Sequence, residues 1–350
     1  MAVSADLPAL ADIAHAWPFV GPPQALMLTP LHGGTNNTLF RVSSATSGGS
    51  SFVLRPAAAQ HDEQRLRLEC DVLAALQGQK LPFATPAPLL TADGAPWAKL
   101  SMPDSLALAT LTRVIAGRAP DRSDPAQAEA AGEAIGALDV ALACIDAADD
   151  TAATTWRTGG ALDQISPLVP DPPAAFARLA LPLAKRDRLR SGYAALMERL
   201  PALYDNLPYQ LCHEDTATTN LLMDGNRVTG ILDFEFLARD LRPTDLVVAL
   251  VWWPVDVLGL GLEWPLVSAL ARGYARSAPL TQPEIAAIPT LYRMRGYTSL
   301  IHRLGLALQG RATMAYVADR ADAALAWEDW LDAYQDRLVA VVQQAMDGAR

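Results

Sequence analysis

The apolar residues near the start of the chain follow the two-residue period of β-strands. Two short β runs, residues 39–42 and 51–55, flank a loop of Ser, Ala, Thr and Gly, and this arrangement predicts a β-hairpin. Residues 62–77 instead carry apolar side chains at helical spacing and predict a helix. We therefore expect this part of the chain to form a strand-rich lobe that carries one helix.

The pattern becomes helical after about residue 112. Asp124 is expected to cap a helix whose first residue is Pro125, because proline is favoured at the first helical position. Residues 185–200 predict a further helix, and helices continue from Thr244 to the end of the chain. Residues 211–236 interrupt this helical part with short strands, and no internal repeat is visible.

Length and composition indicate a folded protein with a large core. The chain has 350 residues, of which 51% are hydrophobic and 19% are charged, so it is long enough for two domains or two lobes. Its most apolar stretch, residues 245–270, is interrupted by Pro254, Asp256, Glu263 and Pro265. No run reaches the roughly 20 uncharged apolar residues of a membrane span, so we interpret this stretch as buried helices.

Charge and cysteine content narrow the possible partners. The formal net charge is −10, which disfavours binding to a nucleic-acid backbone but is compatible with a small basic pocket for an anionic ligand. The 3 cysteines are scattered and odd in number, so they indicate neither a disulfide framework nor a metal site. The first residues lack the basic start of a signal peptide, and we expect a cytoplasmic protein without nucleic-acid or membrane partners.

Residues 211–236 contain the side chains most suited to chemistry. An Asp-Gly turn joins two short strands into a hairpin, with Asp215 and Asn220 in the loop that enters it and Asp233 after its second strand. Because a hairpin brings its two ends together, these three side chains are expected to converge. Two carboxylates and an amide are hard oxygen ligands, which suit Mg²⁺ held together with substrate phosphates. A carboxylate can also orient an attacking hydroxyl group.

The pattern H-x-D-x-x-x-x-N, followed by a hairpin and D-F-x, resembles the aminoglycoside phosphotransferase family. The segments HEDTATTNLL and GILDFEFLARDLRPTDLVVAL are most similar to the homoserine kinase type II branch of that family. Near the start, LHGGTNNTLFRV resembles the Gly-rich nucleotide loop of these enzymes, and FVLR resembles their next strand. The resemblance covers most of the chain in the expected order, and its central motif is highly specific.

The resemblance implies a bilobal α+β fold of the protein-kinase-like type. Residues 1–111 are expected to form a small N-terminal β lobe that covers the nucleotide. Residues 112–350 are expected to form a larger helical lobe with the catalytic hairpin and the acceptor pocket, and ATP and Mg²⁺ to bind between the lobes. The implied reaction moves the γ-phosphoryl group to a hydroxyl group of a small molecule. A homoserine-like amino acid, an aminoglycoside, a choline-like alcohol and a sugar are the candidate acceptors.

The resemblance also implies roles for individual residues. Asp215 resembles the catalytic aspartate that orients the acceptor hydroxyl group, and Asn220 and Asp233 resemble the magnesium ligands. Arg55 stands where these kinases usually have a phosphate-binding lysine, and Glu69 resembles the ion-pair partner of that lysine. The loop that covers the ATP phosphates is matched by Gly33, Gly34 and Asn36.

Arg55 and Glu235 depart from the family pattern. The only lysines of the chain are Lys80, Lys99 and Lys185, so none of them can occupy the strand position of Arg55. Arginine still offers a positive charge and a bidentate donor fork to phosphate, so activity is compatible with this change. Glu235 stands where protein kinases have the glycine of D-F-G, a glycine that related small-molecule kinases often lack.

The acceptor pocket is expected among the C-terminal helices, facing Asp215. An amino-acid acceptor needs a cation for its carboxylate, and Arg295 or Arg303 could supply it. The ammonium group of such an acceptor needs an acidic partner, for which Asp240 or Glu235 is available. Further candidates on these helices are Trp252, Trp253, Tyr297 and His302.

Structural roles compete with functional roles at several positions. We interpret His213 as a core histidine that packs the catalytic loop, and Asp245 as a helix cap that also braces this loop. At least one of the two adjacent tryptophans, Trp252 and Trp253, is expected to belong to the core. Cys212 beside His213 suggests a thiol nucleophile and its base, but adjacent strand residues point to opposite faces.

Three functions are therefore open at the level of the sequence. The first is an active small-molecule kinase. The second is a catalytically silent nucleotide-binding regulatory protein on the same fold, a hypothesis motivated by Arg55 in place of lysine. The third is a hydrolase that depends on Cys212 and needs no Mg²⁺.

Overall fold

The structure is a computed structural model that describes residues 7–31, 39–44, 51–57, 63–103, 105–145 and 160–349 of the chain. The chain divides into two compact units. Unit 1 comprises Met1–Arg118 and Thr229–Glu235, and unit 2 comprises Ala119–Val228 and Phe236–Arg350. Unit 1 is thus completed by a short segment from much further along the chain.

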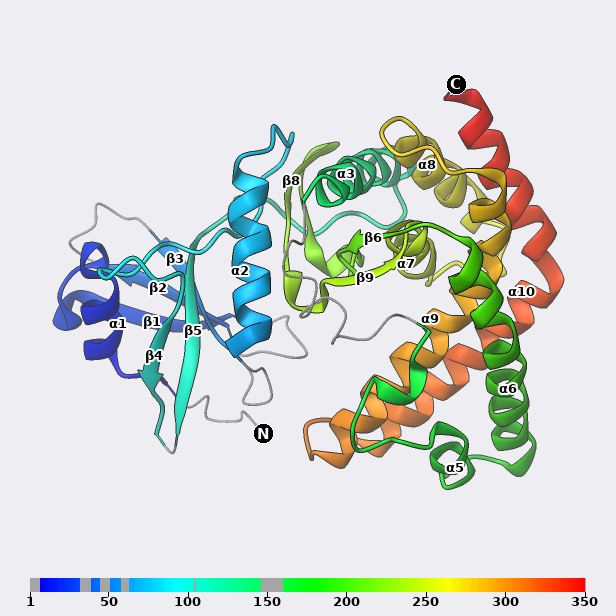
Figure 1. Ribbon diagram of the computed structural model, residues 1–350, viewed down its shortest axis with the longest axis horizontal. Coiled ribbons are helices and arrows are strands. Elements are labelled where there is room, and N and C mark those ends of the chain that lie inside the picture. Colours follow the sequence, from blue (N-terminus) through cyan, green and yellow to red (C-terminus); the bar gives the residue numbers. More distant parts are fainter. Residues whose placement is uncertain are drawn as a thin grey trace. The chain divides into compact units, whose positions relative to one another are not determined.

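Unit 1 is built on a five-stranded antiparallel sheet with the order β1-β2-β3-β5-β4 (Figure 1). The strands are β1 (Leu26–Leu31), β2 (Leu39–Ser44), β3 (Ser51–Pro56), β4 (Ala98–Ser101) and β5 (Leu106–Arg113). β2 and β3 pair directly, with Phe40 opposite Leu54, so the predicted hairpin is confirmed. The sequence pattern did not predict β1, which contains Pro30. Proline is tolerated there because β1 is an edge strand.

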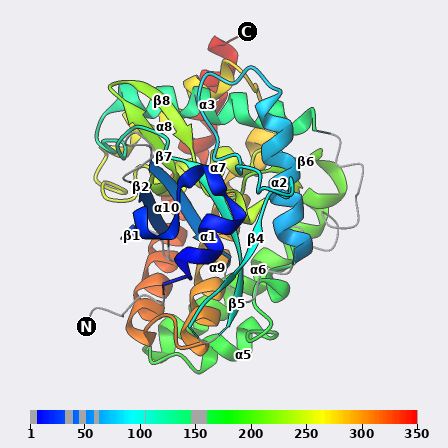
Figure 2. The same ribbon diagram turned by 90° about the vertical axis from the view of Figure 1, so that its left-hand side faces the viewer.

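One face of this sheet carries the hydrophobic core of unit 1. Phe40, Phe52 and Leu54 point into this core and are at most 5% exposed. Helix α1 (Leu10–Ala16) packs beside β4 and contributes to the same core (Figure 2). Because side chains alternate along a strand, Arg55 points to the opposite face from Leu54.

Helix α2 (Glu63–Gln77) supplies the partner of Arg55 on that opposite face, because its Glu69 pairs with the guanidinium group. Leu66, Cys70 and Leu73 of α2 are at most 3% exposed, so the helix and its buried face agree with the sequence pattern. Two short helical turns, η1 (Pro18–Val20) and η2 (Pro23–Ala25), connect α1 to β1.

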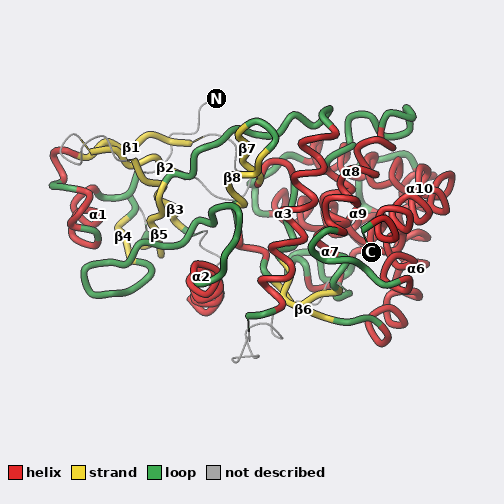
Figure 3. Tube along the Cα trace, turned by 90° about the horizontal axis from the view of Figure 1, so that it is seen from above, coloured by secondary structure: helices red, strands yellow, loops and turns green. Residues whose placement is uncertain are grey.

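Unit 2 is mostly helical, as Figure 3 shows. Its α-helices are α3 (Pro125–Ala143), α5 (Pro172–Ala177), α6 (Leu183–Asn206), α7 (Thr244–Trp252), α8 (Glu263–Ala275), α9 (Gln282–Leu308) and α10 (Met314–Gly348). Asp124 caps α3 by accepting a hydrogen bond from the main-chain nitrogen of Ala126 at 2.8 Å, as the sequence predicts. The sheet of unit 1 and the helices of unit 2 confirm the predicted α+β class.

Short strands and turns interrupt the helices of unit 2 where the sequence predicts them. These elements are η3 (Leu162–Gln164), β6 (Tyr209–Cys212), η4 (Thr218–Asn220), β7 (Leu221–Asp224), β8 (Arg227–Ile231), η5 (Phe234–Phe236) and β9 (Ala238–Leu241). β7 and β8 pair as a hairpin, and β6 pairs antiparallel with β9. The boundary between the two units falls within β8.

Helices α3 and α8 pack very closely because glycines lie in their contact (Figure 1). A Cβ atom at Gly132 would lie 2.1 Å from a main-chain oxygen of α8, and one at Gly273 would lie 1.9 Å from a main-chain oxygen of α3. No side chain fits at such distances, so these glycines determine how near the two helices can come. The same helices carry Asp139 and Tyr274.

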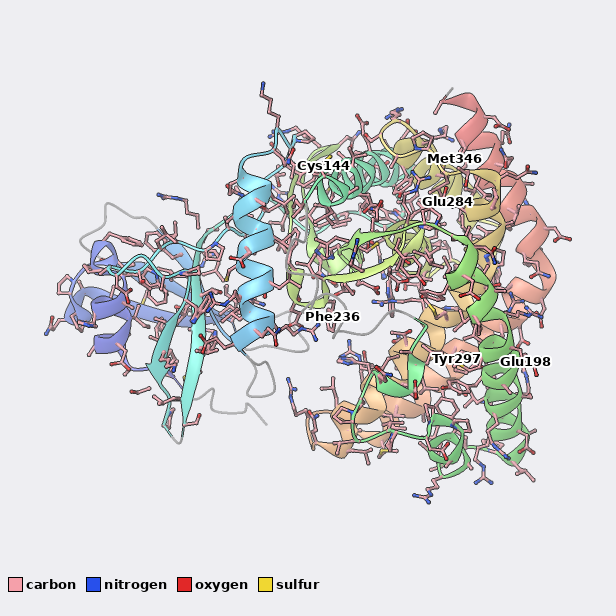
Figure 4. All side chains as sticks on the ribbon, in the orientation of Figure 1. Cys144, Glu198, Phe236, Glu284, Tyr297 and Met346 are labelled. Atoms are coloured by element: carbon pink, nitrogen blue, oxygen red, sulfur yellow. The ribbon has the colours of Figure 1, made fainter. Side chains whose placement is uncertain are left out.

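The apolar stretch that begins at Asp245 is buried, as expected. Leu246, Val248 and Leu250 of α7 are 0% exposed. Helices α9 and α10 pack against each other, and Tyr297 of α9, labelled in Figure 4, packs against Tyr193 of α6. Within the described ranges, no helix is both long enough and apolar enough to cross a membrane.

Candidate active site

The loop between β6 and β7 holds Asp215 in a defined position. The side-chain nitrogen of Asn220 donates to the main-chain oxygen of Asp215 at 2.9 Å and to its carboxylate Oδ2 at 2.7 Å. Asn220 ends the one-turn helix η4, and this turn brings it back towards Asp215. Both bonds use the amide nitrogen, so the amide oxygen of Asn220 is the atom suited to a metal.

Arg295 of α9 reaches the same aspartate. Its guanidinium Nη2 lies 3.3 Å from Oδ1 of Asp215, and its Nη1 lies 3.9 Å from a carboxylate oxygen of Glu214. The side chains of Arg295 and Asp215 are 15% and 21% exposed, so part of the pair faces solvent. The sequence pointed to Arg295 as a cation for an acceptor carboxylate, whereas the structure places it on Asp215.

Asp245 braces the loop from behind. Its two carboxylate oxygens accept hydrogen bonds from the main-chain nitrogens of His213 and Glu214, each at 2.7 Å. The hydroxyl group of Thr216 donates to the main-chain oxygen of Asp245 at 2.6 Å. Glu214 has φ = 68°, a left-handed conformation that is unfavourable for a residue with a side chain, so these bonds also hold a strained backbone. The brace predicted for Asp245 is confirmed, but its side chain caps no helix.

His213 and Cys212 have structural positions. His213 is 0% exposed, and its Nδ1 accepts a hydrogen bond from the main-chain nitrogen of Asp215 at 3.1 Å, which agrees with a core histidine. Cys212 is also 0% exposed. Burial raises the pKa of its thiol well above the ordinary value, and the neighbouring carboxylates add to this rise. A buried thiol that stays protonated is no nucleophile, so the structure argues against the Cys212 hydrolase.

In unit 1, Arg55 and Glu69 form the ion pair that the sequence predicts. Nη2 of Arg55 lies 2.5 Å from Oε1 of Glu69. Burial by itself lowers the pKa of Arg55, but the charges of Glu69, Asp233 and Glu235 outweigh burial and raise it above the ordinary value. Asp233, the expected metal ligand, is therefore within electrostatic reach of the expected phosphate-binding cation.

A small recess lies beside this ion pair. It is lined by Arg55, Ala57, Arg65, Leu66, Glu69 and Glu235. Glu235 was expected near the acceptor, but it lies here, 3% exposed, beside the cation expected to bind phosphate. The expectation for Glu235 as an acceptor residue is therefore corrected.

Arg65 is a residue of this recess that the sequence analysis missed. Its Nε and Nη2 both donate to the main-chain oxygen of Glu235, at 3.0 and 2.6 Å. Asp233, two residues earlier, has φ = 63°, so Arg65 anchors a turn whose backbone is strained. The available signal was the spacing of four residues between Arg65 and Glu69, which puts both side chains on one face of α2.

The donor set expected for magnesium consists of oxygen atoms. Asn220 offers an amide oxygen, and Asp233 offers a carboxylate within electrostatic reach of Arg55. Mg²⁺ prefers such hard donors and usually shares them with substrate phosphates, so the chemistry of these residues fits this ion. Over the described part of the chain, three or more His, Cys, Asp or Glu side chains nowhere form a metal-binding group by themselves.

Several acceptor candidates turn out to be core residues. Trp253 is 1% exposed and offers no surface to a ligand, so this expectation is corrected. Asp240 is 0% exposed, and the Tyr204 hydroxyl donates to it at 2.7 Å, so it is not available to an ammonium group. Tyr297 is 1% exposed and donates to Glu328 at 2.5 Å.

Three further acceptor candidates, Arg295, His302 and Arg303, are half-buried residues of α9. Arg295, Ser299 and His302 follow each other at helical spacing on one face of the helix. The ring of His302 meets the ring of Phe236 edge-on, with centroids 5.7 Å apart. Arg303 lies over the ring of Tyr316 at 5.6 Å. The loop candidates Gly33, Gly34 and Asn36 lie outside the described residues.

The comparison with solved structures defines the class of the fold. An amicoumacin kinase, hAmiN, solved in complex with AMP-PNP, Ca²⁺ and Ami, superposes with a TM-score of 0.64 at 17% identity. The match covers 91% of this chain and 91% of that one. The fold is therefore the kinase-like fold that the sequence predicts.

The sequence comparison identifies the family. A sequence model of the phosphotransferase enzyme family matches residues 28–280, which is well over half of the chain. The chain belongs to this family, and the prediction of a phosphotransferase is confirmed at this level.

Several relatives are named homoserine kinases, and two of them illustrate how such relatives overlap with this chain. That of Methylobacterium radiotolerans is 33% identical over 117 residues, and this match spans 33% of the chain and 35% of the relative, about a third of each. That of Methylobacillus flagellatus is 26% identical over 296 residues, which cover 83% of the chain and 84% of the relative.

Proposed function

We propose that the chain transfers the γ-phosphoryl group of ATP to a hydroxyl group of a small molecule and that it requires Mg²⁺. The observation that carries this proposal is the position of Asp215, whose carboxylate is held by Asn220 at 2.7 Å and by Arg295 at 3.3 Å while the side chain is still 21% exposed. A fixed and accessible carboxylate can accept the hydrogen bond of an acceptor hydroxyl group and orient its attack.

Some of these residues act on the acceptor, and others act on the nucleotide. Asp215 orients the hydroxyl group, and Arg295 balances the charge of this carboxylate. Arg55 places positive charge at the nucleotide phosphates, and Glu69 holds its guanidinium group in that direction. Asn220 and Asp233 would hold Mg²⁺, which when bound supplies positive charge to the phosphate oxygens.

Among the candidate acceptors we place a homoserine-like amino acid first. The support comes from relatives named homoserine kinases, including one that aligns with this chain along most of its length. An amino acid carries a carboxylate, and α9 carries the half-buried Arg295 and Arg303. Aminoglycosides, choline-like alcohols and sugars are the competing acceptors.

A screen of acceptors tests this proposal. ADP release is measured with ATP, Mg²⁺ and one acceptor at a time, namely L-homoserine, an aminoglycoside, choline, ethanolamine and a hexose. We expect release to depend on the acceptor and to be fastest with L-homoserine. The Asp215→Asn protein measures the background. Release that never depends on an added acceptor contradicts the proposed transfer, and a faster reaction with another acceptor contradicts only the choice of homoserine.

A catalytically silent nucleotide-binding protein is the second candidate function, because Arg55 occupies the position of the usual lysine. The ion pair with Glu69 is nevertheless present, and Asp233 is within electrostatic reach of Arg55, which favours a working site. A thermal-shift titration with ATP and Mg²⁺ separates the two functions when it is combined with the acceptor screen. Binding without turnover on any acceptor supports the silent protein.

The Arg55→Lys protein tests the role of this arginine directly. Lysine replaces a planar donor fork by one compact charge on a shorter side chain, so it contacts both Glu69 and phosphate less well. We expect the KM for ATP to rise about tenfold, which corresponds to about 1.4 kcal/mol, with little change in kcat. The matched control is Arg67→Lys, because Arg67 lies on α2 with a side chain 60% exposed. A higher kcat in Arg55→Lys supports the catalytically silent protein. An unchanged KM for ATP means that Arg55 does not contact the nucleotide phosphates.

The Arg65→Ala protein tests whether the clamp on Glu235 orients Asp233. Without the two bonds from Arg65, the strained turn loses its anchor, so Asp233 holds the metal less well. We expect the Mg²⁺ concentration for half-maximal activity to rise about 10–100-fold, as for other groups that orient metal ligands. Nucleotide binding without metal is expected to stay unchanged, and Arg67→Ala is the control. An unchanged Mg²⁺ requirement contradicts this role of Arg65.

A further inference from the structure

Two buried carboxyl groups face each other behind the catalytic loop. Asp139 of α3 is 1% exposed and Asp245 of α7 is 0% exposed. Helices α3 and α7 pack against each other, and the two carboxyl groups lie close enough for each to change the pKa of the other. Nothing in the proposed transfer uses Asp139, so its burial in this place needs a separate physical reason.

The hydrogen bonds around the two groups leave one oxygen atom without a donor. Both oxygens of Asp245 accept main-chain N–H groups of the catalytic loop, at 2.7 Å each. Oδ2 of Asp139 accepts the hydroxyl group of Tyr274 at 2.5 Å. Among the described residues, no N–H or O–H group donates to Oδ1 of Asp139, although this atom is buried.

Two ionised carboxylates cannot make a hydrogen bond to each other, because both are acceptors only. In a buried site they would also repel each other strongly. A single proton removes both problems, since a protonated carboxyl group is a donor. We infer that Asp139 is a neutral carboxylic acid whose Oδ1–H group donates to Asp245, and that it thereby positions the catalytic loop.

The surroundings place the proton on Asp139. Asp245 receives two N–H bonds, which stabilise its ionised form, whereas Asp139 receives one hydroxyl bond. Burial raises the pKa of Asp139 well above the ordinary value, and the charge of Asp245 adds to this rise. Burial also raises the pKa of Asp245, but His213 and the bond from Asp139 oppose it.

The other titratable or charged groups that face this pair come from four elements. They are Tyr274 of α8, Cys212 of β6, His213 and Glu214 of the catalytic loop, and Arg242 after β9. Arg242 of this set forms an ion pair with Glu284 at 2.5 Å. It therefore does not replace the proton between the two carboxyl groups.

The shared proton connects helix α3 to the catalytic loop through a chain of hydrogen bonds. Asp139 donates to Asp245, Asp245 accepts from the backbone of His213 and Glu214, and Asp215 follows directly. Asp139 is therefore a positioning residue, and its role in catalysis depends on the function proposed for Asp215. Its protonation state does not depend on that function.

Replacing Asp139 by asparagine or by alanine distinguishes the loss of a hydrogen bond to Asp245 from a change in side-chain volume. The amide of Asp139→Asn can donate to Asp245 and accept from Tyr274, as the neutral acid does, whereas Asp139→Ala leaves Asp245 without this donor. We expect kcat of Asp139→Asn to stay within about threefold of the parent, and kcat of Asp139→Ala to fall by about tenfold or more, with a smaller change in KM for ATP. An Asp139→Asn protein as defective as Asp139→Ala overturns the inference.

The pH dependence of Tm gives a second readout that needs no activity. An acid whose pKa is raised by folding loses its stabilising effect as pH rises through the folded pKa. The Asp139→Asn protein has no such group, so its Tm minus that of the parent is expected to increase as pH rises above about 4, the ordinary pKa of an aspartate, until pH passes the raised folded pKa of Asp139. Glu133→Gln, which removes a carboxylate 51% exposed on the same helix, is the control without this trend.

The two readouts distinguish the inference from the proposed function. A Tm difference that does not change with pH means that Asp139 is ionised in the folded protein, and this result overturns the inference. A rising Tm difference in a protein without acceptor-dependent ADP release supports the shared proton and contradicts the kinase. If Asp139→Ala fails to fold, the comparison of Asp139→Asn with the parent still decides the question.

Discussion

Replacing Asp215 by asparagine is expected to reduce phosphoryl transfer by about 10²–10⁴-fold, the range for loss of a positioned general base. The carboxylate accepts from Asn220 through one oxygen and from Arg295 through the other. An amide has a single oxygen, so it can keep only one of these bonds and has no negative charge for the acceptor proton. The measurement is kcat with the best acceptor from the screen.

The controls for this variant separate chemistry from folding. ATP binding, followed by thermal shift, is expected to remain within about twofold of the parent, because we propose other residues for the nucleotide contacts. Asp224→Asn removes a carboxylate whose side chain is 76% exposed on the β7–β8 hairpin. This control is expected to leave kcat and ATP binding unchanged. A kcat of Asp215→Asn close to that of the parent means that Asp215 has no role in catalysis.

The second large effect is expected at Asp233. The Asp233→Asn protein keeps the left-handed backbone at φ = 63°, since asparagine tolerates this conformation, but it loses the charge that attracts Mg²⁺. We expect Mg²⁺-dependent binding of a non-hydrolysable ATP analogue to weaken by about 100-fold or more, beyond the cost of losing a group that only orients a ligand. Isothermal titration with and without Mg²⁺ measures this difference.

Two comparisons make the result specific. Asn220→Ala is expected to lose less Mg²⁺-dependent affinity, because an amide contributes a dipole where a carboxylate contributes a full charge. Asp71→Asn removes an exposed carboxylate of α2 and is expected to leave binding unchanged. If Asp233→Asn shows the same metal dependence as the parent, Asp233 is not a metal ligand.

The charges around the catalytic loop explain why Arg295 and the buried acids occur together. The loop carries Glu214 and Asp215 next to each other, and Asp240 is buried beside Glu214. Burial and the charge of Glu214 raise the pKa of Asp240 well above the ordinary value. Arg295 is the cation that approaches both loop carboxylates, so it limits their repulsion while Asp215 remains accessible.

Features that depend on neighbouring residues were predictable. The β2–β3 hairpin follows from two apolar runs around a flexible loop, and α2 follows from the helical spacing of its apolar residues. The Arg55–Glu69 pair was predicted from the resemblance to the phosphotransferase family, because Glu69 stands where those enzymes have the ion-pair partner of the strand cation. By contrast, β1 was missed because Pro30 obscures a strand that only its edge position permits.

The acceptor residues were the least predictable part. Trp253 and Asp240 were candidates because aromatic and acidic side chains suit a ligand, yet both are buried. Whether such a side chain faces a pocket or the core depends on the rotation and tilt of its helix or strand against its neighbours. The local sequence does not contain this information.

The sequence by itself determined the α+β class, the family and the order of the motif residues from Asp215 to Asp233, because these depend on local spacing and residue type. Only the tertiary structure decided which distant groups meet them. Arg295 reaches Asp215 across 80 residues of sequence, and Arg65 reaches Glu235 across 170. Asp139 of α3 accepts a hydrogen bond from Tyr274 of α8, 135 residues further along the chain, and lies close to Asp245 of α7. These contacts exist because folded elements exclude water and place fixed side chains within hydrogen-bond distance, which is a property of packing and not of spacing along the chain.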